Sequence, residues 1–391
     1  MIRALPPLAS WSSAVVAALV GFGGTIALVI QAMRPMGASV AQTGSAITAL
    51  CVGIALAGAL LSFRLRIPVI LAWSTPGAAL LAATTPTLTW PGAIGVFLSA
   101  AILMIATGLI PILGRLANRI PPTIASAMLA GILLPFCLGL FKSGGADPLL
   151  LLLLLAAYIA ARRRVPLYAL LFVLAVGVAA TLIRGDLAAL QAGAAFGVLM
   201  PTMPFFDGSA MLNVALPLFL VTLVSQNLPG LVVLRAAGFE PKPGPLIVGT
   251  GIASLAAAPF GGHAINLAAI TAAICTGEEG HPEPEKRWIV GLLYAGFYLL
   301  LALFSPALVR LFLALPGPVL AALTGLALIP AFVAAIEAML AAKDERDPAL
   351  LTFLATASGM TLFGLGSAFW GLVAGFGALA LRRVIKPPRA I

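Results

Sequence analysis

Residues 258–277 read APFGGHAINLAAITAAICTG, and this stretch decides how the rest of the chain folds around it. A proline and two glycines precede His263 and disfavour a continuous helix there, whereas no further helix breaker occurs before Gly277. The pattern predicts a short extended lead-in followed by a half-helix that begins near His263. A helix interrupted in this way is typical of binding sites inside membrane proteins.

A second stretch has the same character. Residues 70–83 read ILAWSTPGAALLAA, in which Ser74 and Thr75 are good helix caps and Pro76 stands at the favoured first helical position. A slide of 186 residues along the sequence aligns this stretch with the first one. The chain is therefore expected to contain two half-helices, one in each half.

A further slide supports an internal repeat. Moving the sequence by 194 residues places Pro122 and Gly131 on Pro316 and Gly325. Because chance identities are common in a chain so rich in alanine and leucine, coincidence remains the alternative. A repeat of seven segments, an odd number, would run through the membrane in the opposite direction in its second copy.

The composition around both stretches excludes a soluble globular protein. Of the 391 residues 62% are hydrophobic and only 9% are charged, compared with ~25% charged residues in soluble domains. The chain is therefore predicted to be an all-α polytopic membrane protein, with enough apolar residues for roughly twelve or more spans of ~20 residues. Breaks rich in charge, proline or glycine divide it into fourteen segments: 11–33, 40–62, 68–84, 92–113, 121–141, 148–161, 165–183, 210–234, 244–257, 259–276, 287–309, 316–341, 348–363 and 365–381. The third and tenth segments are the two expected to be broken.

The basic residues follow this topology. Of the 22 Lys and Arg residues, only Arg34, Lys142, Arg184 and Arg310 lie outside the alternate loops that hold all the others. Because basic loops stay on the cytoplasmic side, the pattern predicts that both termini are cytoplasmic. The basic residues form no continuous face, so we expect membrane lipid rather than nucleic acid as the surrounding partner, although the net charge is +10.

Ionisable side chains are nearly absent from the predicted segments, and only His263 lies inside an apolar stretch. The chain has two histidines and three widely separated cysteines, without a spacing typical of a metal site. We therefore expect no metal, no cofactor and no disulfide. An intramembrane enzyme is the less favoured class, since a serine paired with His263 would lack the Gly-x-Ser-x-Gly motif.

The two half-helix starts could form an anion site. Each start carries unpaired N–H donors and about half a positive charge from the helix dipole. If the second half of the chain is inverted, both starts meet in the middle of the membrane and can hold a small carboxylate without a buried Arg or Lys. The candidate residues are Thr75, Pro76 and Gly77 at one start and Gly262, His263 and Asn266 at the other. Taken singly, each proline-glycine element is equally well explained as an ordinary kink.

Two further pairs of residues are candidates. Gln226 and Asn227 are adjacent amides inside the eighth segment, and such groups need hydrogen-bond partners within a membrane. Either a neighbouring helix or a substrate could supply them, so both interpretations stay open. Phe22, in a run of small residues, and Phe260 could flank an aromatic ring.

Four stretches resemble a known family, the BenE-type benzoate/proton symporters: WSTPGAALLA (73–82), MLAGILLPF (128–136), SQNLPG (225–230) and PFGGHAINLAAITAAICTG (259–277). The likeness extends over nearly the whole length. It implies the fold of the uracil/xanthine symporters, with fourteen segments in two inverted repeats of seven. It also implies a core domain from residues 1–120 and 201–310 that moves like an elevator against a gate domain from residues 121–200 and 311–391. The gate domain usually forms the contact of a homodimer.

The resemblance also implies the substrate, an aromatic carboxylate such as benzoate that is imported with a proton across a bacterial-type inner membrane. In the uracil relatives, acidic residues stand at the positions that match Gln226 and His263. The loss of both acids suits an anionic substrate, and it leaves His263 as the candidate proton-coupling group. A channel-like anion facilitator is the alternative within transport, and a membrane-embedded enzyme is the alternative from another class.

Overall fold

The computed structural model describes residues 6–83, 88–110, 112 and 121–385. Within these ranges, nine helices are long and apolar enough to cross a membrane. The prediction of a helical, polytopic membrane protein is therefore confirmed. The count of fourteen crossings stays a prediction, because several helices are too short to cross alone. Parts of the third and fourth predicted segments lie outside the described residues, as do five basic residues of the topology: Arg3, Arg115, Arg119, Lys386 and Arg389.

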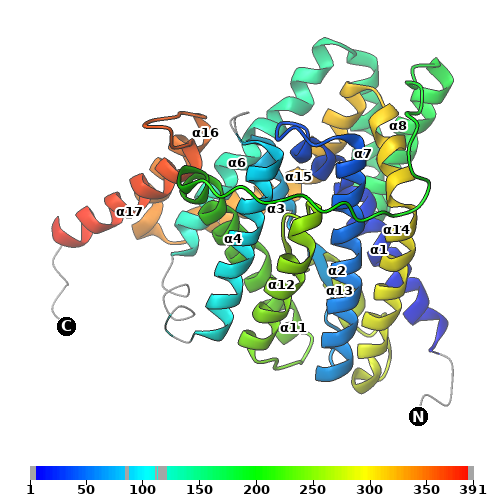
Figure 1. Cartoon of the computed structure of the whole chain (residues 1–391), viewed down its shortest axis with the longest axis horizontal. Coiled ribbons are helices and arrows are strands. Elements are labelled where there is room, and N and C mark those ends of the chain that lie inside the picture. Colours follow the sequence, from blue (N-terminus) through cyan, green and yellow to red (C-terminus); the bar gives the residue numbers. More distant parts are fainter. Residues whose placement is uncertain (1–5, 84–87, 111, 113–120, 386–391) are drawn as a thin grey trace.

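The helices and strands follow one another along the chain in an order that can be traced in Figure 1. The first part holds α1 (Leu8–Met33), α2 (Val40–Leu65), β1 (Leu71–Trp73), α3 (Thr75–Ala83), α4 (Trp90–Leu109), α6 (Pro122–Lys142), α7 (Pro148–Arg164) and α8 (Ala169–Arg184). The second part holds α9 (Gly208–Ala210), the π-helical turn η3 (Met211–Ala215), α10 (Leu216–Thr222), the π-helical turn η4 (Leu223–Asn227), α11 (Leu228–Ala236), α12 (Pro243–Ala257), the short turn η5 (Ala258–Phe260), β2 (Ile265–Leu267), α13 (Ile270–Thr276), α14 (Trp288–Ala314), α15 (Gly317–Leu340), α16 (Arg346–Ala357) and α17 (Ser367–Ile385).

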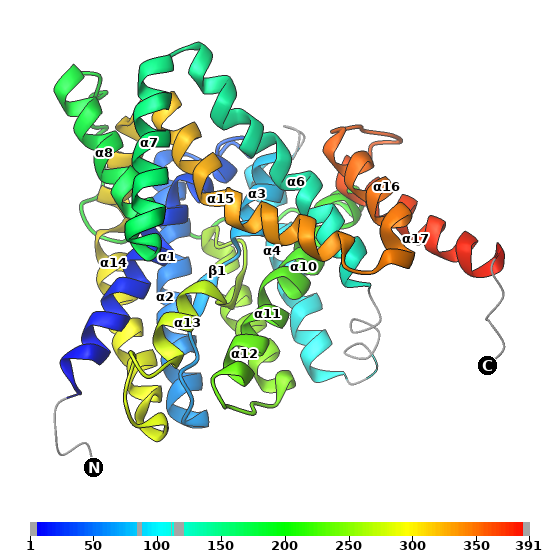
Figure 2. The ribbon, with the colours of Figure 1, turned by 180° about the vertical axis from the view of Figure 1, so that it is seen from behind.

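The two broken segments pair with each other. β1 and β2 form a two-stranded antiparallel sheet, with Leu71 opposite Leu267 and Trp73 opposite Ile265. Figure 2 shows β1 in the middle of the bundle. An extended backbone in such a place needs hydrogen-bond partners for its N–H and C=O groups, because lipid and apolar side chains offer none. Each strand supplies these partners to the other.

Two expectations about the tenth segment are wrong. Its half-helix α13 begins at Ile270 and not near His263, because residues after His263 form β2. An offset of 186 residues also does not align the two broken segments. Their paired strands begin at Leu71 and Ile265, which stand 194 positions apart. This is the slide that aligns the fifth and twelfth segments. The alanine-rich run favours a helix locally, but pairing with β1 satisfies its backbone and outweighs that preference.

The helices pack in two sets. α2 packs on α14, α4 on α12, and α1 on both α3 and α14, while α6 packs on α15 and α16, and α7 packs on α8. Figure 1 shows α16 and α17 at one side of the molecule and α1, α8 and α14 at the other. α3 touches both sets, because it also contacts α6. α3 therefore lies where the two sets of helices meet.

A long segment without helix, residues 185–207, crosses the bundle and is drawn in green in Figure 1. Its N–H groups donate to carbonyl oxygens of other elements: Ala188 to Ala314, Gly197 to Leu303, Thr202 to Pro259 and Phe205 to Pro91. These bonds connect the segment to α14, to η5 and to the start of α4. The segment therefore links elements that surround the strand pair.

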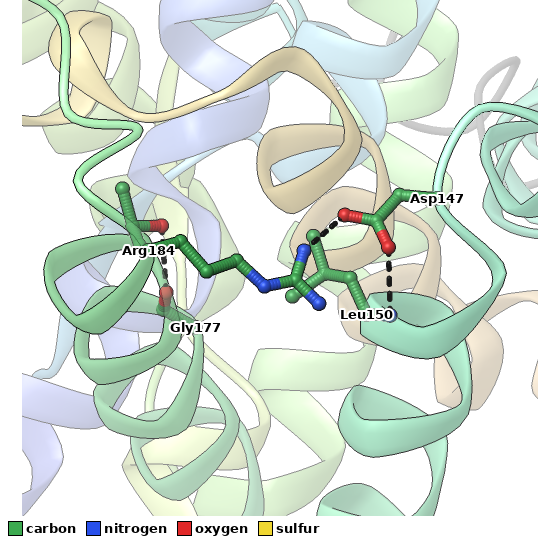
Figure 3. A network of polar contacts seen from close by, with 5 residues as sticks. Asp147, Leu150, Gly177 and Arg184 are labelled. Atoms are coloured by element: carbon green, nitrogen blue, oxygen red, sulfur yellow. Dashed lines mark hydrogen bonds and ion pairs between the residues drawn. The ribbon is translucent and has the colours of Figure 1, made fainter.

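At one end of the α7–α8 hairpin, Asp147 pairs with Arg184 (Figure 3). Asp147 also caps α7, since its Oδ1 accepts the N–H of Leu150 at 3.0 Å. The Leu150 N–H, and after it the Arg184 guanidinium, hold the pKa of Asp147 below its usual range. The pair thus joins the start of one helix to the end of the next.

Asp147→Asn is expected to lower the Tm slightly at neutral pH, because asparagine keeps the helix cap and loses the ion pair. Since the pKa of Asp147 is lowered in the folded protein, its contribution is present above the unfolded-state pKa and is lost as the pH falls through the folded-state pKa. The Tm difference between native protein and variant should therefore shrink below about pH 4. Thermal unfolding in detergent over a pH series measures this. A difference that stays constant down to the lowest pH would contradict the ion-pair explanation.

Candidate functional site

Ser74, the last residue before α3, holds the start of that helix. Its Oγ accepts the N–H of Gly77 at 3.1 Å and the hydroxyl of Thr222 at 3.0 Å. Its backbone N–H donates to the carbonyl of Ala264 at 3.0 Å. Position 77 has no room for a side chain, because a Cβ there would stand 2.7 Å from Leu218 Cδ1. Ser74 therefore joins α3, α10 and the stretch before β2.

His263 lies beside this start. Its Nε2 is 3.0 Å from the carbonyl oxygen of Ser74, and only 1% of the residue is exposed. The ring of Phe97 meets the imidazole edge-on, with the centroids 6.4 Å apart. Its Nδ1 is buried and has no hydrogen-bond partner among the described residues. His263 is the only ionisable side chain expected inside an apolar stretch. It belongs to the second broken segment, but it is hydrogen-bonded to the residue before the first half-helix.

A tight turn places His263 there. Gly261 has φ +96°, a conformation that residues with a side chain rarely adopt. A Cβ at this position would also stand 2.6 Å from the indole of Trp90. Trp90 is itself held, since its Nε1 donates to the Thr202 hydroxyl at 3.1 Å. The N–H of Gly262 donates to the carbonyl of Ala257 at 3.0 Å, which closes the turn at the end of α12.

The two adjacent amides of the eighth segment have different surroundings. Asn227 is fully buried, its Oδ1 accepts the N–H of Leu267 in β2 at 3.0 Å, and its Nδ2 contacts Met104 Sδ at 3.5 Å. Gln226 is only half-buried, and its amide bonds to no side chain or backbone group in the part of the chain that the structure describes. Both stand in the π-helical turn η4, a local widening of the helix that is frequent at functional sites. Protein thus satisfies Asn227, whereas Gln226 stays available.

Asn266 lies within β2, opposite Ala72. Its Nδ2 donates to the Leu267 carbonyl at 2.9 Å, and its buried Oδ1 finds no partner within the described ranges. The side chain is fully buried.

The two phenylalanines expected to flank a ring are separated. Phe22 is buried against the indole of Trp73, with the ring centroids 5.3 Å apart. Trp73 Nε1 donates to the hydroxyl of Thr25 at 2.7 Å, which fixes the indole beside α1. Phe260 is half-buried beside α2, where its carbonyl accepts the Ser45 hydroxyl at 3.1 Å. Phe22 and Phe260 make no ring contact with each other.

The site therefore differs from the expected arrangement in one respect. α3 leaves the strand pair next to Ile265, and α13 leaves it next to Leu71, so the two half-helices begin at opposite ends of the pair. His263 joins Thr75, Pro76 and Gly77 through Ser74 and not through a helix start of its own. This geometry corrects the expectation that His263 stands at the tip of the second half-helix.

The sequence did not indicate the polar link between α10 and α3. Ser74 is predicted as a helix cap, but its bonds to His263 and Thr222 are not. Thr222 stands four residues before Gln226, a spacing that places both on one helix face. This spacing could have indicated Thr222 as a residue of the site.

A cavity of about 700 Å³ lies at the other end of α3. Leu80 of α3, Phe136 of α6 and Val214 of η3 line it, together with residues between α16 and α17. Asn213 bridges the two sides here: its Nδ2 donates to the Gly364 carbonyl at 2.7 Å, and its Oδ1 accepts the Gly366 N–H at 2.8 Å. Residues of both sets of helices line the cavity, and it is large enough for a small organic molecule.

Comparisons with known proteins agree on one family. A family model described as "BenE: Benzoate membrane transport protein" matches residues 6–381. The chain is 40% identical over 361 residues to "Inner membrane protein YdcO" of Escherichia coli, covering 92% of each chain. It is 38% identical over 373 residues to "Benzoate membrane transport protein" of Acinetobacter baylyi, covering 95% of this chain and 94% of that one.

The fold is similar to a solved structure as well. The transmembrane domain of the cyanobacterial bicarbonate transporter BicA superimposes with a TM-score of 0.60 at 18% identity, covering 94% of this chain and 97% of that chain. At this identity the likeness concerns the fold alone.

Proposed function

This chain belongs to the BenE family of benzoate membrane transport proteins, and on that premise we propose that it imports benzoate or a related aromatic carboxylate together with protons. The family and the relatives make the chain an integral membrane transporter and not an enzyme. The fold shared with the transmembrane domain of a bicarbonate transporter agrees with an anionic substrate.

The carboxylate binds, in this proposal, beside the start of α3. The positive end of the α3 dipole lies there, and the Thr75 N–H donates to no described residue. Pro76 has no N–H, and the Gly77 N–H is already taken by Ser74. Gln226 can orient the substrate with its free amide, while Phe22 and Phe260 approach the aromatic ring from α1 and from η5.

His263 carries the proton. It is the ionisable group that the protein fastens to the carboxylate-binding start, and it lies in the interior away from water. Gly262 lets His263 approach Ser74, and Asn227 holds β2, which contains Asn266, in position behind it. When a carboxylate and a proton bind together, the loaded site is close to neutral, which lowers the electrostatic cost of crossing the membrane.

Movement follows the two sets of helices. We propose that residues 1–120 and 201–310 form a core that carries the site, and that residues 121–200 and 311–391 form the gate and the contact of a homodimer. The packing of α2 on α14 and of α4 on α12, against that of α6 on α15 and α16, supports this division. The pairing of β1 with β2 and the common offset of 194 residues support two inverted repeats of seven segments. The distribution of the basic residues supports both termini in the cytoplasm.

The observation that carries the proposal is the bond between His263 and Ser74, which joins the only buried histidine of the predicted segments to the start of a half-helix. Proteoliposomes with labelled benzoate test the function. We expect accumulation above equilibrium when a proton gradient is directed inward, and its loss when a protonophore is added. Protein-free liposomes control for benzoic acid that crosses lipid by itself.

Other outcomes distinguish the alternatives. Uptake that reaches equilibrium without accumulation, whatever the proton gradient, would identify a channel-like facilitator. A thermal-shift screen of aromatic acids in detergent measures binding independently of transport. If benzoate caused no shift, it would not be the substrate.

A further inference from the structure

The bond to Ser74 determines which nitrogen of His263 carries hydrogen. A carbonyl oxygen can only accept a hydrogen bond, so Nε2 must donate to the Ser74 oxygen 3.0 Å away. In the neutral imidazole, Nδ1 therefore bears no hydrogen and is a free acceptor. Nδ1 is buried and unpartnered in the described part of the chain. The nitrogen of His263 that can accept a proton is thus Nδ1, which does not bond to the carbonyl of Ser74.

His263 also lines a small cavity next to the start of α3, since Thr222, which bonds to Ser74, lines the same cavity. The cavity has a volume of about 10 Å³ and lies between α4, α10 and α12. The residues that line it are apolar except for His263, Thr222 and Ser254. This volume is close to one water-sized probe, so the cavity admits a water molecule but excludes an aromatic acid.

We propose that Nδ1 of His263 is the proton-accepting atom, and that its proton arrives through the cavity between α4, α10 and α12 while the carboxylate binds at the start of α3. This inference rests on the proposed function and assigns separate routes to the two solutes. A hydronium ion that reaches the cavity gives one proton to Nδ1 and is left there as a water molecule. The imidazole becomes imidazolium, and the bond from Nε2 to Ser74 persists because Nε2 keeps its hydrogen.

The arrangement lets His263 change its charge without turning its ring. Ser74 holds Nε2, so a ring flip would break that bond, and Phe97 packs against the imidazole and limits its movement. Ser74 is therefore a positioning residue that presents Nδ1 to the cavity.

The first test reads the tautomer directly. Protein labelled with ¹⁵N-histidine, in nanodiscs without substrate, contains two histidines, and a His281→Asn variant assigns the two sets of signals. We expect Nε2 of neutral His263 to carry hydrogen and Nδ1 to carry none. A neutral His263 with hydrogen on Nδ1 overturns the proposal. The reading does not depend on which solute is transported, so it separates this inference from the proposed function.

The second test narrows the cavity. Ala101→Val places two additional methyl groups at a residue that lines it, and Ala106→Val is the matched control on the same helix away from it. We expect Ala101→Val to slow proton-driven accumulation about tenfold, as for a barrier raised by about 1.4 kcal/mol. Exchange of labelled for unlabelled benzoate should persist, because a carrier that exchanges substrate can keep its proton.

Three results would overturn the route. One is native accumulation in Ala101→Val. Another is the loss of exchange together with accumulation in a variant that still binds benzoate, since the cavity would then belong to the substrate path. The third concerns Ala101→Ser, which changes the volume little and adds a hydroxyl that can relay a proton. This variant should accumulate benzoate like native protein, and a defect equal to that of Ala101→Val would show that packing alone causes the effect.

Discussion

His263→Gln is expected to abolish proton-driven accumulation of benzoate while benzoate binding remains. The glutamine amide can donate to the Ser74 carbonyl as the imidazole does, but it cannot take up a proton near neutral pH. The accumulation ratio should fall by at least about tenfold, which corresponds to about 1.4 kcal/mol of lost coupling energy. Labelled uptake into proteoliposomes with an imposed proton gradient measures the ratio, and thermal shift measures binding.

The other histidine supplies the control. His281 lies in the loop before α14, where its Nδ1 accepts the N–H of Glu283 at 3.1 Å. A glutamine there keeps an acceptor of similar reach, so His281→Gln should accumulate benzoate like the native protein. If His263→Gln also accumulated benzoate fully, His263 would have no part in the coupling.

Gly261→Ala is expected to be the most damaging small substitution near the site. An alanine at φ +96° is strained by about 1–3 kcal/mol. Its Cβ would stand 2.6 Å from Trp90 and 2.9 Å from Ala46 Cβ, and overpacking of this kind costs a further ~1–3 kcal/mol. We expect a loss of about 2–6 kcal/mol in unfolding free energy. Transport should fall as well, because this turn directs His263 toward Ser74.

Gly296 in α14 is the matched glycine. It is exposed on the helix surface, and a Cβ there would meet nothing within 4 Å. Gly296→Ala should therefore be neutral or stabilise the helix by up to about 1 kcal/mol. Chemical unfolding of both variants in the same detergent compares them. Equal stability of the two variants would show that the turn at Gly261 tolerates a side chain.

The proposed movement has a structural consequence at the other end of α3. Asn213 bonds to the backbone of Gly364 and Gly366, and so connects the proposed core to the proposed gate. A core that slides against the gate must break both bonds. The cavity of about 700 Å³ beside Asn213 would then change its shape during the cycle.

Much of the site could be predicted from the sequence, because the residue types at a few positions determine it locally. Proline and glycine before His263 and around Pro76 indicated two interrupted segments, since these residues disfavour helix wherever they stand in a span. The scarcity of ionisable residues singled out His263, because charge is costly in an apolar interior. The position of Gly77 and the cap at Ser74 also follow from residue type.

What the sequence by itself determined was therefore the membrane class, the places where two segments break, and the one histidine that could titrate inside them. Only the tertiary structure decided that α13 begins at Ile270, that Asn227 binds β2, and that His263 turns its Nε2 to Ser74. The physical reason is that backbone and side-chain polar groups in an apolar interior must find partners. Here those partners come from strands and helices far apart in the chain, which no local pattern can specify.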